Sequence, residues 1–200
     1  MDDLLSLIAQ SNQLKRIPRM GWLLRGIGPA DAESVAEHTY GVAIIALLLA
    51  ESLDQPVDRG RLLSICLLHD LPETVTADLV PAAVRYLTAA AKYSAEEAAL
   101  SDLLSDVPSA ETFGALWRDF SDGTSTEARL ARDADKLDML IQAAAYEQAG
   151  WRGLDEFWET ISRYAWEFPI SGALHQELVA RREIHRLGLA EGTQAPGDRR

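Results

Sequence analysis

The stretch LLSICLLHD, residues Leu62 to Asp70, decides the fold that we predict for this chain. Its apolar residues recur at positions i, i+3 and i+4, the period of a helix with one buried face, and His69 continues that face at i+7. Asp58 can cap this helix at its start, and Pro72 stops it just past Asp70, because proline has no N–H to donate. We therefore expect a helix whose C-terminal end carries the pair His69-Asp70.

The same helical period runs through the rest of the chain, and no segment shows the alternation of a strand. Ser34 and Glu37 have the spacing of a capping box, which begins a helix that carries His38 and runs toward Leu53. The remaining predicted helices span about residues 3–15, 94–105, 110–120, 127–149, 154–166 and 173–187, and Pro81 is placed to begin one more. The helix over 127–149 carries Asp135. We predict an all-α helical bundle, a single domain over residues 1–187, and a flexible C-terminal tail over residues 188–200.

Length, charge and cysteine content narrow the class of protein. A chain of 200 residues fits one domain, and a formal net charge of −12 leaves no basic stripe for a phosphate backbone, so we expect no nucleic-acid partner. The start, MDDLLSLIAQ, is acidic where a secretory signal would be basic, and no apolar run has the length of a membrane span. The single cysteine, Cys66, suits core packing in a reducing compartment. We expect a soluble, cytoplasmic protein with no membrane partner.

Four polar side chains lie in otherwise apolar helical segments: His38, His69, Asp70 and Asp135. A single histidine in such a segment is usually a packed core residue, but two buried carboxylates are costly unless they pair or bind metal. Two imidazoles and two carboxylates are ligands of a catalytic divalent ion that keeps positions for water and a phosphate oxygen. The ion lowers the pKa of that water, so that hydroxide can attack phosphorus. These residues predict metal-assisted phosphomonoester hydrolysis.

A family resemblance rests on three sequence motifs: SVAEHTYGVA (residues 34–43), LLHDLPE (67–73) and DADKLD (133–138). In this order they resemble the HD-domain metal-dependent phosphohydrolases. Within that superfamily, LKRIPRMGWLLR (14–25), HDLPETVTADLVPAAVRY (69–86) and DADKLDMLIQAAAYE (133–147) resemble the small 5'-deoxynucleotidases. The resemblance covers roughly residues 14–183. It implies an all-α HD-domain bundle that removes the 5'-phosphate from deoxyribonucleoside monophosphates.

The resemblance also implies a role for each site residue. His38, His69, Asp70 and Asp135 would hold the metal, with Asp70 also counted as catalytic together with Glu73, the acid/base residue. Substrate-binding residues would be Arg19 for the phosphate, Asp78 for the deoxyribose and Trp22 for the sugar or base pocket. Family members with two metals need further histidines between the His-Asp pair and the last Asp, and this chain has none there. We therefore expect one divalent ion, which would be Mn2+, Co2+ or a similar metal. The family also implies a homodimer and a small-molecule nucleotide substrate.

Several alternatives stay open at this point. Arg19 could be an ordinary solvated loop cation, Glu73 or Asp78 an ordinary helix cap, and Trp22 a core anchor. Asp138 shares a helix face with Asp135, where it could orient a ligand or pair with a cation, whereas Lys136 would point elsewhere. The aromatic group Trp151, Phe157, Trp158, Tyr164 and Trp166 could be core or dimer interface.

The alternative functions are hydrolysis of another small phosphate ester or of nucleoside triphosphates, and nucleotide binding by a regulator without turnover. A regulator has no need for a water-activating set with an adjacent acid. The histidines at 175 and 185 fall in a predicted helix with charged neighbours, so we expect them at the surface or in helix packing.

Overall fold

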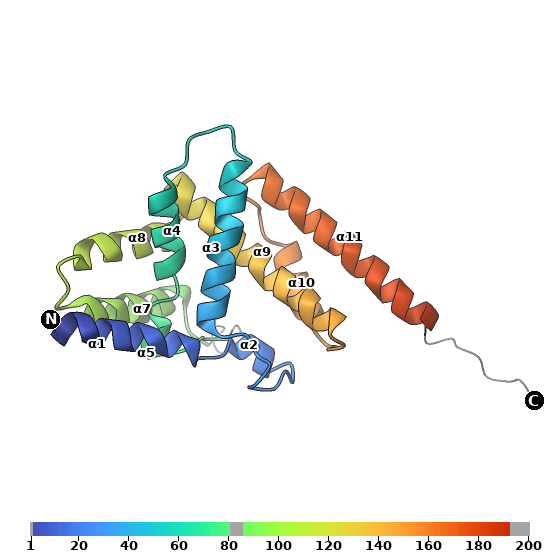
Figure 1. Ribbon diagram of the computed structural model, residues 1–200, viewed down its shortest axis with the longest axis horizontal. Coiled ribbons are helices and arrows are strands. Elements are labelled where there is room, and N and C mark those ends of the chain that lie inside the picture. Colours follow the sequence, from blue (N-terminus) through green and yellow to red (C-terminus); the bar gives the residue numbers. More distant parts are fainter. Residues whose placement is uncertain (1, 81–85, 193–200) are drawn as a thin grey trace, which may run out of the picture.

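The computed structural model describes residues 2–80 and 86–192 as a bundle of helices (Figure 1). Over these ranges the only β-type pairing is an isolated bridge between Pro18 and Ser34, so the predicted all-α fold is confirmed. The helices are α1 (Asp2–Ser11), a short 3-10 helix η1 (Asn12–Lys15), α2 (Met20–Leu23), α3 (Val35–Glu51), α4 (Arg59–Leu68), α5 (Glu73–Thr76), α7 (Ala89–Leu104), α8 (Ala110–Asp122), α9 (Thr126–Gln148), α10 (Asp155–Ser162) and α11 (Pro169–Gly192). None of them is both long and apolar enough to cross a membrane.

Helices α3 and α9 form the centre of the bundle, where they pack closely against each other. In Figure 1, α4 and α8 lie on one side of α3, and α11 lies on the other. The small side chains of Ala46 and Ala134 are fully buried and allow the helices to approach. Val42, Leu62 and Leu130, also fully buried, fill the space around them. Burial of this apolar surface is the main stabilising contribution to the bundle.

The caps predicted from sequence are present. Ser34 Oγ accepts a hydrogen bond from the Glu37 amide at 3.2 Å, while the Glu37 carboxylate accepts one from the Ser34 amide at 2.7 Å. Asp58 caps α4 by accepting from the Arg61 amide at 3.0 Å. These bonds satisfy amides that have no partner inside the helix, so they fix where α3 and α4 begin.

Two predicted helix starts are wrong. We expected a helix from Ser94, but α7 begins at Ala89, because Thr88 Oγ1 accepts from the Ala91 amide at 3.0 Å and three consecutive alanines favour the helix. Helix α11 begins at Pro169, since proline suits a first helical position, and continues to Gly192, past the predicted boundary at residue 187. The residues of the predicted tail after 192 lie outside the described ranges, as does the predicted helix start at Pro81. The domain boundary itself stays a prediction.

The His-Asp pair lies in a turn rather than in a helix. Helix α4 ends at Leu68, so His69 is its cap, although the His69 amide still donates to Ile65 O at 3.0 Å. Pro72 ends the run of helical hydrogen bonds, and the chain turns into α5. Trp117 Nε1, from α8, donates to the His69 carbonyl at 3.1 Å and fastens this turn to the core.

The aromatic group of the C-terminal half belongs to the core. Trp158 is buried, and Phe157, Trp151, Tyr164 and Trp166 pack against a cluster that contains it. This cluster joins α9 and α10 to the segment around α2. Cys66 is fully buried in α4, as expected, and burial raises the pKa of its thiol to about 12. The aromatic residues therefore attach α10 and α2 to α9, and these elements line the candidate site.

Candidate metal centre

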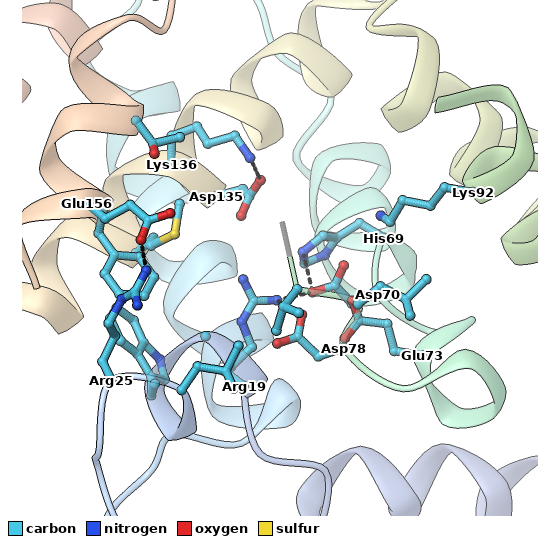
Figure 2. Close-up of a pocket in the computed structure, with 18 of the residues that line it drawn as sticks. Arg19, Arg25, His69, Asp70, Glu73, Asp78, Lys92, Asp135, Lys136 and Glu156 are labelled. Atoms are coloured by element: carbon cyan, nitrogen blue, oxygen red, sulfur yellow. Dashed lines mark hydrogen bonds and ion pairs between the residues drawn. The ribbon is translucent and has the colours of Figure 1, made fainter. Parts of the chain in front are cut away.

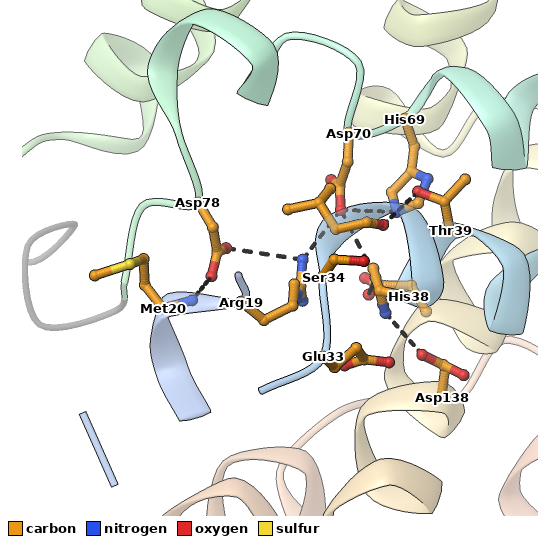
Figure 3. Close-up of polar contacts among 12 residues, drawn as sticks. Arg19, Met20, Glu33, Ser34, His38, Thr39, His69, Asp70, Asp78 and Asp138 are labelled. Atoms are coloured by element: carbon orange, nitrogen blue, oxygen red, sulfur yellow. Dashed lines mark hydrogen bonds and ion pairs between the residues drawn. The ribbon is translucent and has the colours of Figure 1, made fainter. Parts of the chain in front are cut away.

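The four predicted metal-ligating side chains come from three separate segments and lie together. His38 is in α3, His69 and Asp70 are in the turn after α4, and Asp135 is in α9. His38 Nε2 lies 3.2 Å from Asp135 Oδ1. Asp70 Oδ2 lies 3.7 Å from His38 Nε2 and 3.2 Å from His69 Nε2 (Figure 3). His38, His69 and Asp135 offer one ligand atom each, all within 4.8 Å of one another. These distances are short enough for the ligand atoms to bind a single metal ion together.

The hydrogen bonds of the two histidines leave one nitrogen of each ring facing this point. His69 Nδ1 lies 2.6 Å from the Cys66 carbonyl, which can only accept, so Nδ1 carries the proton. His38 Nδ1 faces Asp138 Oδ2 at 2.7 Å in the same way. Both Nε2 atoms are buried and have no hydrogen-bond partner among the described residues. Two imidazole lone pairs thus face two carboxylates that also only accept, a donor set that fits a divalent cation.

The charges around this point favour a positive ion. Burial and Arg19 disfavour a charged His38, yet the neighbouring carboxylates of Asp135 and Asp138 outweigh them and raise its pKa to about 9. Without an ion, these carboxylates thus favour a proton on the ring, at the point where a divalent cation would take its place. Burial also disfavours ionised Asp70, but His69 and Arg19 hold its pKa below the usual range. Burial likewise disfavours ionised Asp135, but Lys136 and His38 hold its pKa well below the usual range. Two ionised carboxylates therefore stabilise positive charge between the imidazoles.

A cavity of about 350 Å³ opens beside these residues (Figure 2). All four outer residues predicted from sequence line it, together with His69, Asp70 and Asp135; the four are Arg19, Trp22, Glu73 and Asp78. Its volume is at the lower end of the range for small-molecule sites, about 300–1,000 Å³. The cavity thus connects the candidate metal centre to a space of the size of a small ligand.

Arg19 is not a solvated loop cation. Its Nη1 donates to Asp70 Oδ2 at 3.0 Å and lies 3.7 Å from Asp78 Oδ1. Burial alone would lower the pKa of the guanidinium, but Asp70 and Asp78 raise it. Asp78 in turn accepts from the Met20 amide at 2.5 Å, which ties the segment after α5 to α2. Arg19 therefore lines the cavity next to Asp70, one of the predicted metal-ligating residues.

Glu73 and Asp78 are placed by a short, strained segment. Glu73 is the first residue of α5; it is buried, and its Oε2 has no hydrogen-bond partner within the described ranges. Burial, followed by the charges of Asp70 and Asp78, raises the pKa of Glu73 to about 9, so it is protonated at neutral pH. Ala77, just before Asp78, has a φ of +55°, a conformation that costs an L residue about 1–3 kcal/mol. This strained turn brings Asp78 back toward Arg19.

Trp22 lies in the cavity wall, but its ring is packed against two other aromatic rings. It is only 2% exposed, and its ring centroid lies 4.2 Å from that of Phe157 and 5.2 Å from that of Tyr146. Its Nε1 donates to Glu33 Oε2 at 3.0 Å. These contacts favour the core-anchor interpretation over stacking on a substrate base.

Several residues of the cavity were not predicted. Lys136 was expected to point elsewhere, which is wrong: it lines the cavity, and its Nζ donates to Asp135 Oδ2 at 2.7 Å because the long lysine stem can bend along the helix. Lys92 from α7 also lines it, as does the ion pair of Arg25 with Glu156 (Figure 2). Helical periodicity shows which face of a helix is buried, but not which distant helix it meets. Neither His175 nor His185 belongs to a metal-suited cluster in the described part of the chain.

An all-α fold in which histidine, a His-Asp turn and a later aspartate converge defines an HD-type metal-binding domain. The family model described as HD domain matches residues 11–167, and the chain belongs to this family.

Curated relatives and solved structures agree with this assignment. The chain is 35% identical over 151 residues to the protein named 5'-deoxynucleotidase HDDC2 from Danio rerio, covering 74% of this chain and 72% of that one. The Homo sapiens protein of the same name is 30% identical over 146 residues, covering 72% and 68%. A conserved hypothetical protein from Pyrococcus furiosus superposes with a TM-score of 0.75 at 39% identity, covering 90% of this chain and 99% of that chain. A predicted metal-dependent phosphohydrolase from Magnetospirillum magnetotacticum gives 0.67 at 25% identity, covering 98% and 95%.

The two interpretations of Trp22 predict different results for Trp22→Phe. A core anchor loses the bond from Nε1 to Glu33 and leaves a buried carboxyl unpaired, so the free energy of unfolding should fall by about 1–3 kcal/mol. Urea denaturation measures this change, with Trp151→Phe, a partly buried tryptophan of the same cluster, as the control. Unchanged stability together with weakened substrate binding would instead make Trp22 a substrate contact.

Proposed function

We propose that this protein is a divalent-metal-dependent 5'-deoxynucleotidase, which hydrolyses deoxyribonucleoside 5'-monophosphates to deoxynucleoside and phosphate. The observation that carries the proposal is the convergence of two unpartnered, buried imidazole nitrogens with Asp70 and Asp135 at the edge of a cavity that also holds Arg19 and Glu73. The relatives named 5'-deoxynucleotidase, which span most of this chain, support the choice of reaction.

In this proposal one Mn2+ or Co2+ ion is held by His38 Nε2, His69 Nε2 and the carboxylates of Asp70 and Asp135. Such an ion, when bound, polarises a phosphate oxygen and lowers the pKa of a coordinated water toward neutrality. The donor set supports one ion, because both imidazoles already use their other nitrogen for a hydrogen bond inside the protein.

The substrate lies with its phosphate toward Arg19. A guanidinium has five N–H donors, so a bond to Asp70 leaves others for phosphate oxygens. Lys92 and Lys136 add positive charge along the same cavity. Asp78 can accept a hydrogen bond from the sugar 3'-hydroxyl through Oδ1, since its Oδ2 already accepts from the Met20 amide. A local group of cations thus attracts an anionic substrate to a chain of net charge −12.

Glu73 supplies the proton that the reaction needs. A water oxygen forms a bond to phosphorus as the bond from phosphorus to the 5'-oxygen breaks, and Glu73 gives its proton to the departing 5'-oxygen. The proton lost by the attacking water then returns to the carboxylate, which restores Glu73 for the next turnover. Its buried position in the cavity lining and its unpartnered Oε2 support this role over that of a cap.

Two alternatives remain distinct from this proposal. Hydrolysis of another small phosphate ester or of a nucleoside triphosphate would use the same residues on a different substrate. A regulator that binds nucleotide without turnover would have no use for an unpartnered acid beside the metal centre, so Glu73 favours an enzyme.

Phosphate release from a panel of nucleotides tests the proposed function. Chelator-treated protein should be inactive, and added Mn2+ or Co2+ should restore phosphate release from dAMP and dTMP. AMP should react more slowly; an apolar pocket wall rejects an extra hydroxyl by up to about 10²-fold. Equal kcat/KM for dAMP and AMP would remove the preference for deoxyribose. Release only from triphosphates, or tight binding without release, would support one of the alternatives instead.

The role of Glu73 predicts that Glu73→Gln loses about 10²–10⁴-fold in kcat on dAMP, because general acid/base groups typically contribute that much. Bound metal, measured by elemental analysis, should stay at the wild-type level. Glu111→Gln, at an exposed position on α8, is the control and should keep full activity. Turnover close to wild type in Glu73→Gln would make Glu73 a structural cap.

We further propose that the enzyme is a homodimer. Tyr40, Ile44 and Leu48 form an apolar stripe along α3 and are 69%, 41% and 65% exposed. Ile141 of α9, the helix that packs against α3, is also exposed. Light scattering should give twice the chain mass, and Ile44→Glu should give a monomer, while Leu4→Glu on α1 should not. A wild-type monomer at micromolar concentration would contradict the proposal.

A further inference from the structure

Asp138 takes no part in the proposed reaction, yet it contacts one of the proposed metal-ligating residues. It lies in α9, three residues after Asp135, and its Oδ2 is 2.7 Å from His38 Nδ1 (Figure 3). Both residues are buried: His38 is 1% exposed and Asp138 is 6% exposed. The carboxylate therefore meets the ring on the side opposite the metal centre.

This contact decides which nitrogen of His38 carries a proton. A carboxylate only accepts, so the proton of the neutral ring is held on Nδ1, and the lone pair of Nε2 points toward Asp135 and Asp70. Glu33 also lies near His38 and Asp138, but its Oε2 accepts from Trp22 Nε1. Asp138 is thus the residue that hydrogen-bonds the outer nitrogen of His38.

Gly41 makes room for this carboxylate. It lies in α3, one turn after His38, and a Cβ added to it would be 2.0 Å from Asp138 Oδ1. Glycine is disfavoured inside a helix, so its presence here needs a local reason. The missing side chain allows Asp138 to approach α3 closely enough to reach His38.

We propose that Asp138 is a positioning residue, which holds His38 in the tautomer and orientation for metal binding, and that Gly41 provides the space it needs. The proposal rests on the metal site of the proposed function. Removing the partner that orients a metal-binding histidine typically weakens metal affinity about 10–100-fold.

Metal affinity tests the role of Asp138. Titration of chelator-treated protein with Mn2+ against a competing dye should show binding about 10–100-fold weaker in Asp138→Asn than in wild type, with helix content unchanged. The matched control is Asp133→Asn. Asp133 is also buried in α9, but it accepts from the backbone amides of Glu167 and Phe168, so this variant should lower Tm and leave metal affinity unchanged. Wild-type affinity in Asp138→Asn, or an equal loss in Asp133→Asn, would overturn the proposal.

A double-mutant cycle tests the role of Gly41. Gly41→Ala should weaken Mn2+ binding in the wild-type background, because the new Cβ displaces the carboxylate. In an Asp138→Ala background the same change should have no further effect on affinity. Additive losses in the two backgrounds would overturn the link between Gly41 and Asp138.

Nitrogen NMR of metal-free protein separates this proposal from the proposed function. In a pH series carried to the point where the His38 ring is neutral, the wild-type ring should be protonated on Nδ1, because Nδ1 faces Asp138 Oδ2 at 2.7 Å. Asp138→Ala should show a mixture of tautomers. If wild-type protein binds neither Mn2+ nor Co2+, the proposed function fails, and the proposed role in metal binding fails with it. If metal binds but His38 is protonated on Nε2 in the wild type, the positioning role alone is overturned.

Discussion

The structure depends on one electrostatic constraint: two imidazole nitrogens and two carboxylates meet at one point, and each offers a lone pair there. His38 Nε2 and His69 Nε2 face Asp70 and Asp135 at 3.2 to 3.7 Å, without a hydrogen-bond partner for either nitrogen among the described residues. Such an arrangement is unfavourable unless a positive charge lies between the groups. The close packing of α3 on α9 and the bond from Trp117 to the His69 carbonyl hold the groups in place.

The same constraint organises the rest of the site. Arg19 pairs with Asp70, Lys136 pairs with Asp135, and Asp138 binds the outer nitrogen of His38. Each of these contacts either offsets part of the negative charge or fixes the direction of a lone pair. The cavity lining therefore combines four basic side chains, Arg19, Arg25, Lys92 and Lys136, with the carboxylates of the site, in a protein that is strongly acidic as a whole.

Much of the fold follows from sequence, because helix caps and apolar periodicity act locally. The capping box at Ser34 and the cap at Asp58 are where the pattern predicts them. The predicted start of α7 is wrong because two possible caps, Thr88 and Ser94, lie six residues apart, and the alanines after Thr88 extend the helix back to the earlier one. The three sequence motifs also contain His38, His69, Asp70 and Asp135, and the structure brings these side chains together. Lys136 and the contacts of α10 escaped prediction because they depend on side-chain bending and on helix positions far apart in the chain.

The central claim is that one divalent ion binds where the four side chains converge. Anomalous diffraction from crystals of protein loaded with Mn2+ tests it most directly. The account predicts a single strong peak per chain, within bonding distance of His38 Nε2, His69 Nε2 and the carboxylates of Asp70 and Asp135. A peak elsewhere, or none at this point in protein that otherwise keeps the described fold, would contradict it.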